Sequence, residues 1–153
     1  MKTSVYLRTA SVLTLIHAIL HTAGGVFGKP APGTAAMVVA TMQANRFRVF
    51  GVTRSYADFY LGLGLGITIF LLVAAVLMWQ MAGLARTDAA RLRPMMATLM
   101  VGFLAFAVNS YLYFFLAPVI VEVLIALCLG LAMMAAKSVP AVSAAPAAQQ
   151  SAR

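Results

Sequence analysis

Charged residues are scarce in this chain of 153 residues: they make up 9% of it, with 3 Asp and Glu against 11 Lys and Arg. A soluble domain carries about a quarter of its residues as charges, so the shortage excludes an ordinary globular enzyme. A disordered chain is excluded as well, because 63% of the residues are hydrophobic. Cys128 is the single cysteine, so the chain forms no internal disulfide. Long uncharged apolar runs dominate instead, which is typical of a polytopic membrane protein.

Four apolar stretches are long enough to cross a bilayer, which takes about 20 mostly apolar residues in a helix. The predicted spans lie near 6–27, 56–83, 94–115 and 118–136. We therefore expect an all-α polytopic membrane protein with four transmembrane helices in a bundle. Only a short uncharged run separates Glu122 from Lys137. The fourth helix is therefore expected to begin before Glu122, at Pro118, because proline is favoured at the first helical position.

The segments outside the spans differ in composition. Residues 29–55 are predicted to form an outer loop with a short interfacial helix capped by Thr34, either a lid over the bundle or a helix resting on headgroups. The Ala, Ser, Pro and Gln-rich segment 137–153 is predicted to be a disordered cytoplasmic tail.

Basic residues are distributed unequally between the two sides of the predicted membrane. Four basic residues fall in the outer loop, and seven fall on the other side: Lys2, Arg8, Arg86, Arg91, Arg93, Lys137 and Arg153. Cytoplasmic loops carry the excess of Lys and Arg, so both termini are predicted to be cytoplasmic. Because these charges flank apolar spans, they indicate a membrane partner and no nucleic acid.

Polar side chains inside an apolar span are costly, so each one requires an explanation. At roughly 1.5 Å of rise per residue, the polar residues of the predicted spans all fall in the outer half of the bundle. The candidate ligand- or proton-binding residues are His17, His21, Asn109 and Glu122. His17 and His21 share one helix face because they are four residues apart.

Several kinds of chemistry suit such a cluster. Imidazole and carboxylate groups can exchange protons near neutral pH, bind a cation, or act as acid and base on a lipophilic substrate. Two histidines and a carboxylate also suit a transition metal. The metalloprotease pattern H-E-x-x-H is absent, since Ala-Ile-Leu separates the histidines, and we assign no metal and no known cofactor. The alternative is that these side chains join helices by hydrogen bonds.

The start of the second span carries a helix-capping signal. Ser55-Tyr56-Ala57-Asp58 matches the S-x-x-[DE] capping box directly before an apolar run. Arg54 lies four residues before Asp58 and is expected to pair with it if the first turn extends that far. Arg54, Ser55 and Asp58 are therefore assigned a structural role, as a cap or ion pair.

Glycines recur at a spacing that favours close helix contact. Gly62 and Gly66 form a G-x-x-x-G pattern, and Gly24 and Gly28 repeat it at the end of the first span. We expect these four glycines to bring the first two spans together, with His21 near the start of the second. A dinucleotide-binding loop is excluded because no strand precedes the glycines.

Three motifs resemble those of a family of small, uncharacterised bacterial four-helix integral membrane proteins. They are His21-Thr22-Ala23-Gly24-Gly25, Gly51-x-x-Arg54-Ser55-Tyr56-x-Asp58-Phe59-Tyr60-x-Gly62 and Thr87-Asp88-Ala89-Ala90-Arg91-x-Arg93-Pro94. The likeness covers residues 5–136. It implies a fold and an inner-membrane location, and no activity.

The leading functional expectation is a bundle that binds a small lipophilic ligand or handles a proton. The site is expected between the first, second and fourth spans, with His21 and Glu122 at its polar centre and His17 and Asn109 beside them. The alternatives are a structural or assembly subunit without chemistry and a small proton-coupled transporter. Whether the protein is an enzyme, and whether it forms oligomers, is left open.

Overall fold

The computed structural model describes residues 2–136, so the predicted tail 137–153 lies outside the described residues. Four segments are long and apolar enough to cross a membrane, and they confirm the predicted all-α fold class. They are α1 (Lys2–Leu20) with the π-helix η1 (His21–Val26), α3 (Tyr56–Asp88), the 3-10 turn η2 (Ala90–Leu92) with α4 (Arg93–Tyr113), and α5 (Leu116–Ala135). The chain is a multi-pass membrane protein.

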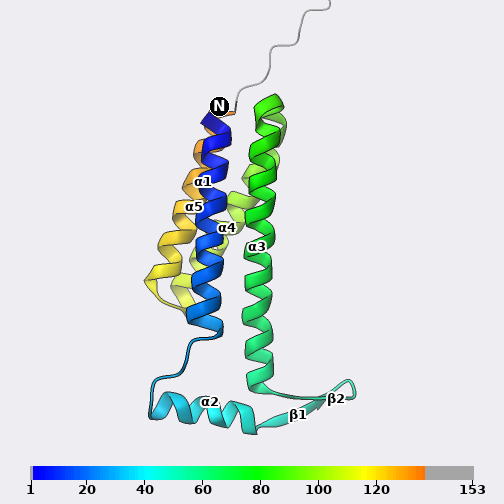
Figure 1. Ribbon diagram of the computed structural model, residues 1–153, viewed down its shortest axis with the longest axis vertical. Coiled ribbons are helices and arrows are strands. Elements are labelled where there is room, and N and C mark those ends of the chain that lie inside the picture. The colour runs from blue at the N-terminus through cyan, green and yellow to red at the C-terminus, as the bar shows by residue number, and fades with distance from the viewer. Residues whose placement is uncertain (1, 137–153) are drawn as a thin grey trace, which may run out of the picture.

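The four helices alternate in direction along the chain. In Figure 1, α1 and α4 run toward the end that carries the outer loop, and α3 and α5 run back. α1 lies at the centre of the arrangement, packed against both α3 and α5, and α5 packs in turn against α4. The start of α1 and the end of α5 therefore lie at the same end of the bundle.

The contact between α1 and α3 combines small side chains with larger apolar ones. Buried residues recur along α1 at Ser4, Leu7, Ser11, Thr14 and Ala18, and along α3 at Thr68, Leu71, Ala75, Met78 and Ala82. Steps of three and four residues give the 3.5-residue repeat of helices that cross at a shallow angle. This pattern makes a continuous seam between the first two spans.

Hydroxyl groups bind the two helices across this seam. Ser4 Oγ donates to the carbonyl oxygen of Ala82 at 2.6 Å, and Ser11 Oγ donates to that of Ala75 at 2.7 Å. Such bonds form only where a small residue lets the two backbones approach closely. One full heptad separates Ser4 from Ser11, and the same interval separates their two acceptors.

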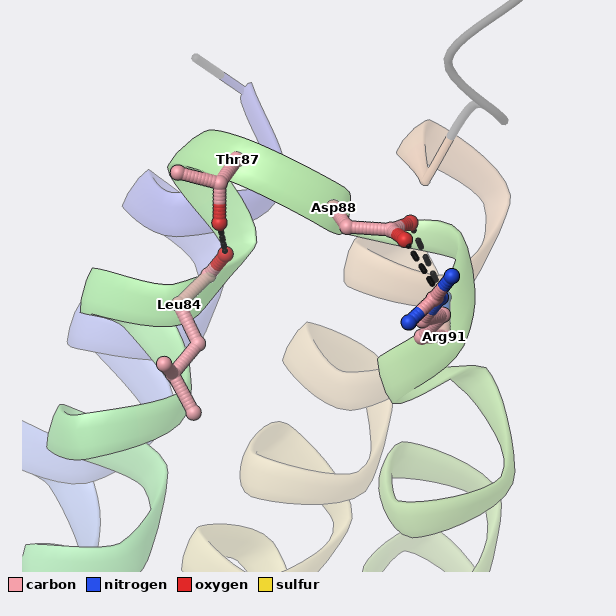
Figure 2. A network of polar contacts seen from close by, with 4 residues as sticks. All are labelled: Leu84, Thr87, Asp88 and Arg91. Carbon is pink, nitrogen blue, oxygen red and sulfur yellow. Dashed lines mark hydrogen bonds and ion pairs between the residues drawn. The ribbon is translucent and has the colours of Figure 1, made fainter. Parts of the chain in front are cut away.

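The turn between α3 and α4 is held by local polar contacts, which Figure 2 shows. Thr87 Oγ1 donates to the carbonyl oxygen of Leu84 at 2.9 Å, and Arg91 Nε pairs with Asp88 Oδ2 at 2.8 Å. The Arg91 amide also donates to Asp88 Oδ1 at 3.4 Å. These contacts close the chain reversal with side chains from the turn itself.

The outer loop contains more structure than its sequence predicts. The expected short helix is α2 (Thr34–Ala44), but Thr34 is its first residue and not its cap: Gly33, at φ 91°, precedes it, and no side chain caps the helix. A β-hairpin follows, formed by β1 (Arg46–Val49) and β2 (Val52–Ser55). Figure 1 shows α2 lying across the end of the bundle, with the hairpin extending from it.

The hairpin turn consists of two residues. Phe50 and Gly51 both have positive φ, at 48° and 82°, as a type I′ turn requires. β1 alternates polar and apolar residues as Arg46-Phe47-Arg48-Val49. Such alternation is typical of a strand, but a run of four residues is a weak indication of one.

The turn between the third and fourth spans lies earlier than expected. α4 ends at Tyr113 and α5 begins at Leu116, so Pro118 stands in the first turn of α5 and not at its first position. The first four amides of a helix have no acceptor within the helix. Proline, which lacks an amide hydrogen, is therefore tolerated at Pro118 without loss of a helical hydrogen bond.

The prediction that Gly24, Gly28, Gly62 and Gly66 bring the first two spans together is wrong. A Cβ atom at Gly24, Gly62 or Gly66 would meet no neighbouring atom of the described residues within 4 Å, so these glycines do not pack against another described helix. At Gly28 a Cβ atom would collide with the carbonyl group of Gly24, which is a local constraint of the helix end. The G-x-x-x-G pattern predicted the wrong face of α3, because the α1–α3 seam follows the buried residues that recur in steps of three and four.

Gly64 lies at the close contact instead. A Cβ atom there would be 3.0 Å from Val26 Cγ2, which is tighter than an ordinary contact. The absence of a side chain therefore lets η1 approach the backbone of α3.

Aromatic residues on α3 mark two levels that fit the faces of a bilayer. Tyr60 and Trp79 are separated by about 29 Å of helix, which matches the roughly 30 Å hydrocarbon thickness of a membrane. At the second level the Arg8 guanidinium lies over the Trp79 ring, 5.0 Å from its centroid.

Replacing Ala75 by leucine is expected to destabilise the bundle by about 1–3 kcal/mol, because the seam has no room for the added atoms. The matched control is Ala105→Leu, the same change at an exposed position of α4. Thermal unfolding in detergent, followed by circular dichroism, compares the two variants. Equal losses of stability would contradict the assignment of the α1–α3 seam.

Candidate functional site

Glu122 is a buried carboxyl group in the second turn of α5. It keeps 3% of its surface exposed. Ser110 Oγ, in the last turn of α4, donates to Glu122 Oε1 at 3.0 Å. Glu122 Oε2 is buried and has no hydrogen-bond partner among residues 2–136. An unpartnered polar atom in an apolar interior costs several kcal/mol. Glu122 is therefore only half satisfied by the protein.

His17 is buried on α1 with 8% of its surface exposed, and its Nδ1 atom also has no hydrogen-bond partner in the described part of the chain. It belongs to a row of buried residues seven positions apart: Thr3, Ala10 and His17. Each of them directly precedes a residue of the row that faces α3. α1 is covered chiefly by α3 and α5. We infer that the row of His17 is buried on the side of α1 that faces α5.

His17 and Glu122 lie at similar distances along their helices from one end of the bundle. His17 is about 22 Å along α1 from Lys2, and Glu122 is about 21 Å along α5 from Ala136, at roughly 1.5 Å per residue. The starting points of both measurements lie at the same end of the bundle (Figure 1). No hydrogen bond or ion pair joins His17 to Glu122 within residues 2–136. Two helices that pack together therefore each carry one buried, unpartnered polar atom at a similar distance from that end.

His21 takes a different role from the predicted one. Its Nε2 atom lies 3.1 Å from the carbonyl oxygen of Gly64 and donates to it, because a carbonyl oxygen only accepts. Thr22 Oγ1 lies 2.9 Å from Thr68 Oγ1, which also belongs to α3. The structure thus confirms that His21 lies near the start of the second span. It binds the α3 backbone there and is not hydrogen-bonded to Glu122.

Asn109 does not face the site. Its side chain is exposed on α4, whereas the next residue, Ser110, is buried and binds Glu122. The sequence prediction considered only amides, imidazoles and carboxylates and missed this hydroxyl. Ser110 stands three residues after Ala107 and seven after Phe103, both buried. That spacing is the signal that could have identified it.

Ser55 and Asp58 form the predicted capping box at the start of α3. Asp58 Oδ2 accepts from the Ser55 amide at 2.7 Å, and Ser55 Oγ accepts from the Asp58 amide at 3.1 Å. The predicted ion pair is not formed, since in residues 2–136 only Arg91 and Asp88 pair within 4.0 Å. Arg54 belongs to β2, so helical spacing does not bring it to Asp58.

The polar groups His17, Ser110 and Glu122, called the buried polar site below, have a definite chemical capacity. A carboxyl oxygen and an imidazole nitrogen can each donate or accept according to the position of the proton. Buried polar atoms in native structures have partners, from the protein or from bound water. In the described part of the chain, no group of three or more His, Cys, Asp or Glu residues could hold a metal ion.

These features define a class: an all-helical, multi-pass membrane protein with an incompletely satisfied polar site inside its apolar span. Comparison with family models, curated proteins and solved structures gives no match for this chain. The argument for function therefore depends on the site itself.

Replacing Ser110 by alanine is expected to cost roughly 1–3 kcal/mol, because Glu122 would lose its hydrogen-bond donor inside the bundle. Asn109→Ala, one residue earlier, is expected to change stability by less than about 0.5 kcal/mol. The midpoint of thermal unfolding in detergent measures both. A larger loss for Asn109→Ala would show that the wrong face of α4 has been assigned to the site.

Proposed function

We propose that this protein holds the polar group of a small lipophilic ligand, or a proton, at the buried polar site, in the outer half of the bundle. The observation that carries the proposal is the pair of buried, unpartnered atoms, His17 Nδ1 and Glu122 Oε2, on helices that pack together. Each atom alone costs free energy in an apolar surrounding. A third group that binds both atoms offsets this cost.

The chemistry of the site favours a small group with both a donor and an acceptor. Ser110 fixes one oxygen of Glu122, so the second oxygen is the one available to a ligand. The surrounding helices supply apolar side chains such as Phe103, Ile125 and Leu129, as in most small-molecule sites. An imidazole and a carboxyl group at similar distances from one end of the bundle also suit proton transfer to or from such a ligand.

The setting of the site is a bacterial inner membrane with both termini in the cytoplasm. The resemblance of the H-T-x-G-G and G-x-x-R-S-Y-x-D-F-Y-x-G motifs supports that membrane. The excess of Lys and Arg at the end that carries the N-terminus supports the orientation. α2 and the hairpin then face the outer side, as does the π-helix η1.

A structural or assembly subunit is the second candidate, and the α1–α3 seam favours it. There Ser4, Ser11, His21 and Thr22 are all used to bind α3. Polar side chains in this protein therefore serve helix packing at several levels. The buried polar site differs from the seam because two of its atoms have no hydrogen-bond partner within residues 2–136.

The proposal predicts a bound molecule that depends on His17 and Glu122. Native mass spectrometry of the protein in mild detergent is expected to show a stoichiometric non-protein mass, which His17→Gln and Glu122→Gln lose. His21→Gln is the matched control: it is expected to retain the mass and lose stability, because His21 binds Gly64. A metal assay and a visible spectrum would identify the chemical class.

For a proton, the corresponding readout is uptake into liposomes that contain the purified protein and a pH-sensitive dye. Glu122→Gln is expected to abolish uptake, because the amide does not exchange the proton of a carboxyl group. A protein that carries no bound mass, with equal uptake in wild type and Glu122→Gln, would overturn the proposal and favour the structural subunit.

A further inference from the structure

A hollow of about 290 Å³ lies on the surface of the protein where β2 meets the start of α3. It is lined by Arg54, Asp58, Phe59, Gly62 and Leu63. This is the level of Tyr60, near the start of α3, which the proposed orientation places toward the outer side of the membrane. The hollow is separate from the buried polar site and shares no residue with it.

Two opposite charges border this hollow without pairing with each other. The one hydrogen bond that the Arg54 guanidinium makes within residues 2–136 is from Nη1 to the carbonyl oxygen of Thr53, at 3.2 Å. Asp58 uses Oδ2 for the Ser55 amide, and Oδ1 carries none of the hydrogen bonds of the described residues. Both side chains therefore keep binding capacity for an external group.

The rest of the lining is apolar and opens toward the lipid. Phe59 and Leu63 are exposed at the membrane surface of α3, and Gly62 leaves space because it has no side chain. A Cβ atom at Gly62 would meet nothing within 4 Å. The floor can therefore accept a hydrocarbon segment along α3, directly below the charged rim.

We propose that this hollow binds a phospholipid whose headgroup carries a phosphate and a primary ammonium, as phosphatidylethanolamine does. The Arg54 guanidinium matches the phosphate, for which its planar donors are suited. Asp58 Oδ1 accepts from the ammonium. One acyl chain covers the floor at Gly62. Charge complementarity at the rim and the apolar floor select a zwitterionic lipid over a free phosphate.

The lipids to compare are phosphatidylethanolamine, phosphatidylcholine and phosphatidylglycerol with identical acyl chains. Each is added to the purified protein in detergent, and bound lipid is counted by native mass spectrometry. Phosphatidylethanolamine is expected to bind about tenfold more tightly than either of the others. Phosphatidylcholine has no N–H donor for Asp58, and phosphatidylglycerol has no cation. Inorganic phosphate is expected not to compete.

Matched variants separate the contacts. Arg54→Gln is expected to weaken phosphatidylethanolamine binding about tenfold, whereas Arg48→Gln, at an exposed arginine of β1 outside the hollow, leaves it unchanged. Asp58→Asn keeps an oxygen for the helix cap and loses only the preference over phosphatidylcholine. Gly62→Leu fills the hollow and blocks all three lipids, while Gly66→Leu, one turn away and equally open, has no effect.

Two results would overturn the lipid site. One is equal affinity for the three lipids; the other is an equal response to Gly62→Leu and Gly66→Leu, which would show that lipid binds the whole surface of α3 and no particular hollow. Neither result bears on His17 or Glu122, so this inference and the proposed function fail separately.

Discussion

Close approach of α1 and α3 is the interaction on which the rest of the structure depends. In a bilayer the apolar side chains gain little by leaving lipid, so helix pairs are held by packing and by interhelical hydrogen bonds. Here Ser4 and Ser11 reach backbone carbonyl groups of α3 because Ala75 and Ala82 keep the backbones near. With α3 fixed on one side of α1, α5 packs on the other and places Glu122 within the bundle.

Much of the fold follows from hydrophobicity and length alone. The four apolar spans, the capping box at Ser55 and Asp58, and the short helix in the outer loop are local properties of the sequence. The pairing of helices is not, because it depends on which of several small-residue rows faces a neighbour. Gly62, Gly64 and Gly66 alternate along one stretch, and only tertiary contact distinguishes Gly64 from the other two.

The candidate site was likewise predictable only where it depends on local properties of the sequence. Burial of His17 and Glu122 followed from the cost of polar groups in an apolar span. The pairing of Glu122 with Ser110 depended on the rotation of α4 about its axis, which decides whether residue 109 or 110 faces inward. The separation of His21 from Glu122 depended on the affinity of imidazole for a backbone carbonyl group of α3. Neither rotation nor competing acceptors are visible in a list of polar residues.

The π-helix at the end of α1 determines how the chain leaves the membrane. In an α-helix, two residues five positions apart point about 140° away from each other. In a π-helix, where each amide bonds five residues back, two such residues point in a similar direction. This wider turn lets His21 and Val26 both contact α3 at Gly64. The wider turn therefore changes the direction in which the last residues of η1 point, relative to α1. Phe27 still bonds to Thr22, five residues back, so the wider turn persists to the point where the chain leaves the helix for the outer loop.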